Sequence, residues 1–190
     1  SAHDGLDLGV SLRIPEGEPR GILQVVHGMA EHRQRYHDFM DFAAEHGYVA
    51  IIHDHRGHGE SAGNEDNYGF FGKNGVDGLI NDTFQVTEYV KNRFPGLKLT
   101  LFGHSMGSLV VRSYMKKYDR SVTSLVVCGS PSKRLGASAG KLIAKFLQIF
   151  LSERHRSNFL NKMAFGGYLK NFPEAKSPSA WIASNEAVVE

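Results

Sequence analysis

Short apolar runs divide the first 130 residues of the chain, and each has the length of a buried β-strand. They lie at residues 21–26, 48–52, 99–102 and 125–128. A run that is apolar without alternation is typical of a strand covered on both faces of a parallel sheet. Before them, residues 5–14 alternate apolar and polar positions, which predicts an edge strand with one face in water.

The segments between these runs repeat apolar residues at helical spacing. The expected buried positions are Phe39, Phe42 and Ala43 in 36–46, then Leu79, Val86, Val90 and Phe94, and finally Leu109, Val110 and Ser113. Gly47 is placed to end the first of these helices. After an opening antiparallel pair of strands, the repeated strand–helix–strand order predicts a mostly parallel sheet with helices on both faces. The expected fold class is α/β, with residues 1–130 as its core.

The strongest local signal is the stretch Gly103-His104-Ser105-Met106-Gly107, which stands between a predicted strand and a predicted helix. It fits the G-x-S-x-G pattern of a nucleophile elbow, in which a serine occupies a strained turn. A side chain at Gly103 or Gly107 would press against the neighbouring strand or helix. The pattern predicts Ser105 as a nucleophile, and the alternative is an ordinary turn, because the motif also occurs by chance.

A nucleophilic serine needs hydrogen-bond donors for the oxyanion that forms when it attacks a carbonyl. The backbone N–H of Met106 begins the helix behind Ser105 and is one candidate. His27, followed by a glycine, comes directly after the strand 21–26, so we expect the N–H of Met29 to be the second donor. His27 and Ser105 both follow strands, as Asp54 does, and the carboxyl ends of parallel strands meet at one edge.

Other polar residues near the strand ends have simpler interpretations. Residues 54–61 are interpreted as a structural turn in which a carboxylate holds Arg56. His53, His55 and His58 suggest a metal site, but their spacing across a strand end does not bring three imidazoles to one face. We expect no metal and no cofactor. His104 projects to the opposite side of its strand from Ser105, so it is not expected to be the base.

Composition narrows the range of functions. The chain has 190 residues with 41% hydrophobic content, enough for one domain with a core. Its net charge of +2 gives no reason to expect a nucleic-acid partner. Cys128 is the only cysteine, which excludes an internal disulfide, and its apolar surroundings predict a buried, inert thiol. With no membrane-spanning run and no secretory signal at its start, we expect a soluble, cytoplasmic protein.

The residues after Ser105 offer no credible catalytic acid or base. In elbow enzymes the chain order is serine, then acid, then histidine. The one histidine after Ser105 is His155, whose basic surroundings are typical of a solvated surface. No Asp or Glu directly follows the strand that ends at Cys128, where the chain reads Pro131-Ser132-Lys133-Arg134.

Residues 131–190 have a different pattern from the core. Between Ala139 and Leu151 a wide apolar stripe at helical spacing is opposed by Lys141 and Lys145, and no buried strand follows. This predicts a helical insertion after the strand that ends at Cys128. Taken alone, the apolar stripe is open to packing on the core or docking on a membrane surface.

With these residues identified, the chain resembles the α/β-hydrolase superfamily, and within it the monoacylglycerol lipase and lysophospholipase group of serine hydrolases. The resemblance rests on residues 4–6, His27-Gly28-Met29-Ala30-Glu31-His32 with Arg35-Tyr36, residues 54–61, and Gly103-His104-Ser105-Met106-Gly107. It implies Ser105 as nucleophile and the Met29 and Met106 amides as oxyanion hole. It also implies that residues 131–190 begin a helical cap, which gives the apolar stripe between Ala139 and Leu151 a third candidate role, covering a single acyl chain. By the same resemblance the catalytic Asp and His lie beyond Glu190, in a C-terminal part of the fold absent from this chain.

Together these expectations describe a serine hydrolase that cleaves carboxylic esters of single-acyl lipids through an acyl-enzyme on Ser105. Its expected partners are the lipid ester, a membrane surface touched transiently by the cap and, in a nicked protein, a second fragment that completes the fold. Two alternatives stay open. One is an acyltransferase or thioesterase using the same serine, and the other is a non-catalytic module that keeps the pocket without the triad.

Overall fold

The computed structural model describes residues 4–131 and Asn158. In this part the chain forms a five-stranded sheet in the order β1-β3-β2-β4-β5. Its strands are β1 (Val10–Arg13), β2 (Gly21–Val26), β3 (Tyr48–His53), β4 (Leu99–His104) and β5 (Ser124–Cys128). β1 runs antiparallel to β3, whereas the other neighbouring strands are parallel. The predicted α/β class with a mostly parallel sheet is confirmed.

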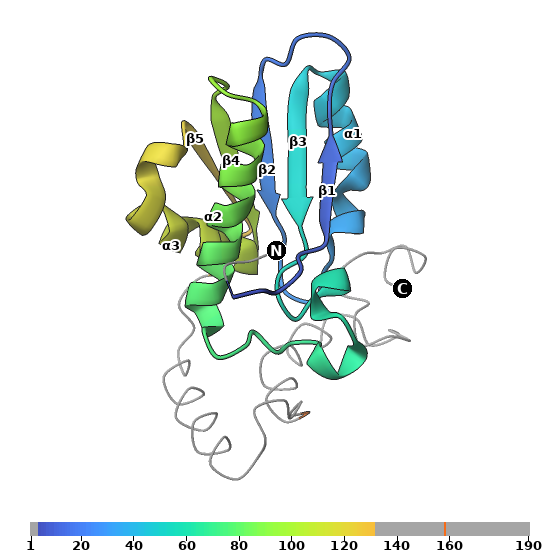
Figure 1. Ribbon diagram of the computed structural model, residues 1–190, viewed down its shortest axis with the longest axis vertical. Helices are drawn as coiled ribbons and strands as arrows, with labels where there is room; N and C mark the ends of the chain where they lie inside the picture. The colour runs from blue at the N-terminus through green and yellow to red at the C-terminus, as the bar shows by residue number, and fades with distance from the viewer. Residues whose placement is uncertain (1–3, 132–157, 159–190) are drawn as a thin grey trace. The chain divides into compact units, whose positions relative to one another are not determined.

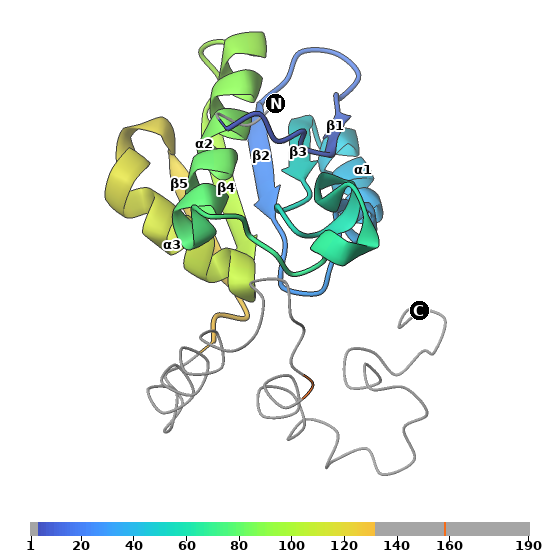
Figure 2. The same cartoon turned by 60° about the horizontal axis from the view of Figure 1, so that its bottom comes forward.

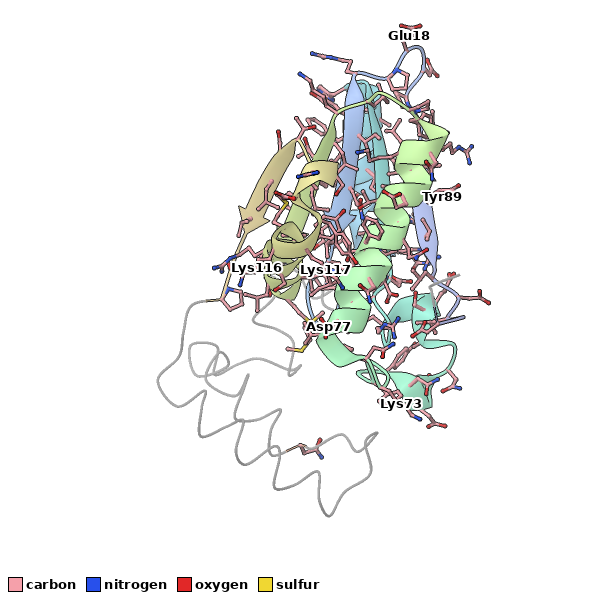
Figure 3. All side chains as sticks on the ribbon, turned by 60° about the vertical axis from the view of Figure 1, so that its left-hand side comes forward. Glu18, Lys73, Asp77, Tyr89, Lys116 and Lys117 are labelled. Carbon is pink, nitrogen blue, oxygen red and sulfur yellow. The ribbon has the colours of Figure 1, made fainter. Side chains whose placement is uncertain are left out.

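Helices cover both faces of the sheet, as Figure 1 shows. α1 (His37–Glu45) packs on one face, and α2 (Gly75–Arg93) and α3 (Met106–Tyr118) pack on the other. Short 3-10 helices lie in the connections, namely η1 (Arg33–Tyr36), η2 (Gly59–Ala62), η3 (Glu65–Asn67) and η4 (Asp119–Ser121). Tyr89, Lys116 and Lys117 lie on the outward sides of α2 and α3 (Figure 3).

The central strand β2 explains why its sequence shows no alternation. Val25 packs with the α1 side chains of Met40 and Ala43, while Ile22 and Val26 belong to the larger cluster that includes α2 and α3. All five side chains are buried. Of the three that belong to β2, Val25 points to one face of the sheet, and Ile22 and Val26 point to the other. Both faces of β2 therefore require apolar residues.

The helices form where they were predicted, but the buried face differs in two of them. The stripe expected for α2 is confirmed, since Leu79, Val86 and Val90 are buried. In α1 the buried residues are Met40 and Ala43, whereas Phe39 and Phe42 are exposed. In α3 the buried apolar residues are Val110, Val111 and Tyr114, whereas Leu109 is exposed. A helix stripe wider than its contact leaves part of its apolar edge in water.

The predicted pairing of the two opening strands is wrong. β1 pairs with β3, from Val10 opposite His53 to Arg13 opposite Ala50. The crossover through α1 places β3 directly beside β2, and β4 occupies the other side of β2. Because both edges of β2 are taken, the open edge of β3 is the position left for β1.

The expectation of a buried thiol at Cys128 is also wrong. β5 is the edge strand of the described sheet, and Leu125, Val126, Val127 and Cys128 are all exposed. α3 packs near β5, but in the described part of the chain no strand pairs with its outer edge. An apolar strand sequence indicates burial only when elements on both sides cover it.

The chain divides into two compact units, Ser1–Ser132 and Lys133–Glu190. Apart from Asn158, the described residues belong to the first unit. The predicted helix between Ala139 and Leu151, His155 and nearly all of the predicted cap lie outside the described residues. The division into a core at 1–130 and a cap at 131–190 therefore stays a prediction. None of the described helices is both long enough and apolar enough to cross a membrane.

Candidate active site

Three loops converge at the carboxyl end of the parallel strands. His27 follows β2, Asp54 follows β3 and Ser105 follows β4, and these strands pair in register. Figure 2 shows the loops after β2 and β3 at the same end of the sheet as the start of α3. The predicted meeting of these strand ends is confirmed.

Ser105 occupies a strained turn between β4 and α3. Its φ of 50° and ψ of −115° lie in a region that side-chain-bearing residues rarely adopt. Its N–H donates to the carbonyl of Cys128 at 2.9 Å, and its carbonyl accepts the Ser108 hydroxyl at 2.5 Å. These bonds hold the turn from both sides, so the serine keeps a conformation that it would not choose alone.

The two glycines of the motif are required by close packing, as the sequence predicts. A Cβ at Gly103 would lie 2.6 Å from the Gly107 carbonyl oxygen and from Cγ2 of Val111, both on α3. A Cβ at Gly107 would overlap the carbonyl oxygen of Val26 and lie 2.6 Å from that of His27. The start of α3 thus sits directly against the end of β2, which fixes the serine beside the loop that follows β2.

Gly28 brings that loop against the nucleophile. A Cβ placed on Gly28 would lie 3.1 Å from Cβ of Ser105. The backbone at Gly28 therefore passes so close to the serine that a side chain there would crowd it. The residue types found here are those expected for an oxyanion loop, a glycine followed by a residue that presents its N–H. Met29 is half exposed, and Met106 is the first residue of α3. The first N–H groups of a helix have no acceptor within it.

The backbone of this loop is held on both sides of Met29. The Gly28 N–H donates to Glu31 Oε2 at 2.8 Å, and the Gly28 carbonyl accepts from Nδ1 of His27 at 2.7 Å. Ala30, which has a φ of 58°, donates its N–H to Nε2 of His58 at 3.3 Å. Among the described residues the N–H of Met29 has no acceptor, in contrast to its two neighbours.

The protonation of His27 follows from its contacts. Its Nε2 accepts the N–H of His55 at 3.0 Å, so Nδ1 must carry the proton that is donated to the Gly28 carbonyl. Burial lowers the pKa of His27 to about 4, which keeps the ring neutral at physiological pH. Because the C=O and N–H of a trans peptide point in opposite directions, His27 also turns the Met29 N–H away from itself.

A polar network joins this loop to the elbow. Oε2 of Glu31 accepts both the Gly28 N–H and the Tyr36 hydroxyl, each at 2.8 Å. Nδ1 of His104 lies 3.2 Å from the Tyr36 oxygen and 3.4 Å from Oε1 of Glu31. His104 is thus engaged by Glu31 and Tyr36, away from the Ser105 hydroxyl.

His53 and His55 form a buried cluster with His27 at the ends of β2 and β3. The rings of His27 and His55 lie 4.3 Å apart, and those of His53 and His55 lie 5.3 Å apart. Both ring nitrogens of His53 and Nδ1 of His55 are buried and have no hydrogen-bond partner within the described part of the chain. Burial lowers the pKa of His53 to about 3 and that of His55 well below its ordinary value. Among the described residues no group of His, Cys, Asp or Glu side chains has an arrangement that could hold a metal ion.

Arg56 has the structural role that the sequence predicts. Its guanidinium donates two hydrogen bonds to the buried carboxylate of Asp82, both at 2.7 Å, and a further one to Asp4 at 3.0 Å. The hydrogen bonds that Arg56 donates to Asp82 raise the pKa of Arg56 and keep it charged. Asp54 instead binds the Arg33 guanidinium and accepts the N–H groups of Arg33 and Glu60. These ion pairs fix the loop after β3.

Sequence reasoning assigned no role to Glu31 or Tyr36. Their contacts depend on the turn at Ala30, which directs the Glu31 side chain back toward Gly28. A detectable signal was present in the sequence, because Glu31 is the one acidic residue in the segment 27–36, which otherwise carries Arg33, Arg35 and two histidines. Nothing in the spacing, however, links residue 31 to residue 104.

Comparison with known proteins establishes the family. A family model described as serine aminopeptidase, S33, matches residues 17–190. The chain belongs to this family. Among solved structures, a thermostable carboxyl esterase from Bacillus coagulans covers all of this chain with a TM-score of 0.89 and 29% identity. The described architecture is the α/β-hydrolase fold, which confirms the fold expected from the resemblance.

Relatives in sequence fall in the predicted group. The chain is 30% identical over 115 residues to a monoacylglycerol lipase of Mycolicibacterium smegmatis, and this alignment covers 60% of the chain. It is 31% identical over 96 residues to the human monoglyceride lipase, covering 50% of the chain. The matched regions span 39% and 30% of these relatives, and the chain spans 61% of the esterase structure. The resemblance to the monoacylglycerol lipase group is thus confirmed for a part of the length of these relatives.

Proposed function

We propose that this chain supplies the nucleophile and the oxyanion hole of a serine hydrolase that cleaves carboxylic esters. The observation that carries the proposal is the strained turn at Ser105, packed against Gly28 of the loop after β2. Such strain persists only where surrounding structure enforces it, and it concentrates at functional sites. The esterase and lipases to which the chain is similar support the same chemistry.

In the acylation step, the Ser105 oxygen attacks the carbonyl carbon of the ester and its proton passes to a histidine base. The carbonyl oxygen becomes an oxyanion, which accepts hydrogen bonds from the backbone N–H groups of Met29 and Met106. When the tetrahedral intermediate collapses, the bond to the alcohol breaks and the alcohol leaves with the proton held by the base. The product is an acyl-enzyme on Ser105.

In the second step, water attacks the acyl-enzyme and gives its proton to the same base. The fatty acid leaves as the proton returns to the serine oxygen, so the enzyme is regenerated without a cofactor. We assign the base and its orienting acid to residues beyond Glu190, either in the same polypeptide or in a second fragment. The backbone N–H groups of Met29 and Met106 suit the oxyanion because they are already in place and need no reorganisation as its charge develops.

The proposed substrates are single-acyl lipids of the monoacylglycerol or lysophospholipid type. The names of the lipases similar to this chain support this class. In this proposal residues 131–190 begin a cap that covers the acyl chain and touches a membrane surface while the substrate enters. Cytoplasmic localisation belongs to the same proposal. An acyltransferase or thioesterase would use the same serine and differ only in the acceptor or leaving group.

The family description favours a second candidate, the cleavage of an amino-terminal peptide bond. The nucleophile and oxyanion donors would be the same in that reaction. The two candidates differ in the leaving group. An amine is a poorer leaving group than an alcohol, so its departure depends more strongly on proton transfer from the catalytic histidine. Parallel assays with a fatty-acid glycerol ester and an aminoacyl anilide separate them.

The decisive experiment treats the full-length protein with a fluorophosphonate probe and locates the adduct by mass spectrometry. We expect the adduct on Ser105 and release of glycerol from a monoacylglycerol. Ser105→Ala should abolish both, whereas Ser113→Ala, on the helix that follows Ser105, should leave them unchanged. Adding an alcohol or thiol acceptor and analysing the products tests for acyl transfer. A Ser105→Ala protein that still hydrolyses the ester would overturn the proposal.

A further inference from the structure

Two separate segments supply the proposed oxyanion donors, and their spacing must be fixed for both to reach one oxygen atom. Met29 lies in the loop after β2, and Met106 begins α3. Glu31 lies between these segments. Its carboxylate accepts the N–H of Gly28, next to Met29, and one of its oxygens lies 3.4 Å from the ring of His104, next to Ser105.

We infer that Glu31 is a positioning residue for the hydrolysis, and that it sets the distance between the Met29 and Met106 donors. This inference rests on the proposed function. It assigns Glu31 no contact with the substrate. Its action is through the backbone of Gly28 on one side, and through Tyr36 and His104 on the other.

The carboxylate suits this task because two hydrogen-bond donors and the His104 ring converge on it. The Gly28 N–H and the Tyr36 hydroxyl both donate to Oε2, while Oε1 faces Nδ1 of His104. Burial alone would raise the pKa of Glu31, but the hydrogen bonds from Gly28 and Tyr36 and the nearby His104 lower it overall. The group is therefore ionised, and its charge is bound by these donors rather than free to repel an oxyanion.

The loop offers little else to hold the Gly28 peptide from this side. The carbonyl of that peptide, on His27, accepts Nε2 of His55 at 3.1 Å, and its N–H donates to Glu31. With Glu31 shortened to alanine, the peptide keeps only its carbonyl bond and can rotate. Rotation of this peptide moves Gly28, which lies directly against the Ser105 side chain. The donor at Met29 then loses its alignment with the one at Met106.

The test compares four variants of the full-length enzyme on a soluble ester, with kcat and KM measured separately. Glu31→Ala should lower kcat by about 10- to 100-fold with KM within about 3-fold, because a misplaced donor removes stabilisation from the oxyanion of the transition state and little from the ground state. Glu31→Gln keeps an acceptor oxygen and should remain within about 3-fold of wild type. Tyr36→Phe should lower kcat by about 3- to 10-fold. Glu45→Ala, at an exposed site on α1, is the matched control.

A second readout separates positioning from a merely structural role. The affinity for a trifluoromethyl ketone, which forms a tetrahedral adduct on the serine, should fall by the same factor as kcat/KM across the series. Equal kcat and equal inhibitor affinity in wild type and Glu31→Ala would overturn the inference while the proposed function stands. If Glu31→Ala does not fold, Tyr36→Phe decides in the same way. A wild-type protein without an adduct on Ser105 would overturn the proposed function itself, and the inference with it.

Discussion

Replacing His53 by leucine should make the protein more resistant to acid. The His53 ring is fully buried at the end of β3, and neither of its nitrogens has a hydrogen-bond partner among residues 4–131. Burial, together with the neighbouring His27, lowers its pKa from 6.5 to about 3. Above pH 6.5 the ring is neutral in both the folded and the unfolded chain. Below it only the unfolded chain binds the proton, so the folded state loses stability as the pH falls toward about 3.

The size of the effect follows from this displacement of the pKa. Each pH unit between the two pKa values changes the free energy of unfolding by about 1.4 kcal/mol. Between pH 6.5 and a pH of about 5, His53 therefore removes about 2 kcal/mol, and His53→Leu removes that loss. At a pH of about 7.5 the substitution should be neutral or stabilising by about 1 kcal/mol, because it eliminates two unsatisfied buried atoms.

The assay is urea unfolding of the full-length protein at a series of pH values from about 7.5 to about 5. The quantity of interest is the difference in unfolding free energy between wild type and His53→Leu, which should widen as the pH falls. Ile52→Val, at the neighbouring position of β3, is a control that should cost about 1 kcal/mol at every pH. A difference for His53→Leu that stays constant over this range would show that the ring is protonated, or paired, in the folded protein.

Two further substitutions test the packing of the site. Gly107→Ala places a methyl group against the carbonyl oxygen of Val26 and should lower the free energy of unfolding by about 3 kcal/mol, measured by urea unfolding. An unchanged urea midpoint would mean that β2 and α3 lie further apart than the structure places them. Asp82→Asn removes the fully buried carboxylate that pairs with Arg56, leaving only the more exposed Asp4, and should cost about 3–5 kcal/mol in the same assay. The exposed Glu88→Gln on the same helix should cost no more than about 0.5 kcal/mol, and equal losses for the two α2 variants would contradict the ion-pair assignment.

The parts of the fold that the sequence predicts are those with a single local cause. β2 is predicted because both of its faces need apolar residues, and the elbow is predicted because Gly103 and Gly107 leave room for a close contact. The positions of His27, Asp54 and Ser105 follow from the same reasoning, since parallel strands bring their carboxyl ends together. Local pattern and global arrangement agree at these positions.

The remaining features depend on contacts between residues distant in sequence. Phe39 and Met40 are both apolar and adjacent, and only the angle at which α1 meets the sheet decides that Met40 is buried. The exposure of Cys128 depends on which strands flank β5, which its own residues do not encode. The link between Glu31 and the elbow could not be predicted for a similar reason, because His104 comes from β4, far along the chain.

The hydrogen bond from the Ser105 N–H to the Cys128 carbonyl makes the serine dependent on the edge of the sheet. A strand at the edge of a sheet exchanges its amide protons sooner than a central strand, because it can open without unfolding the rest of the domain. When β5 opens at Cys128, the Ser105 turn loses this bond and keeps the one between the Ser105 carbonyl and the Ser108 hydroxyl. The proposed nucleophile is therefore held in its turn partly by the edge of the described sheet, and a segment that pairs with the outer edge of β5 would strengthen that hold.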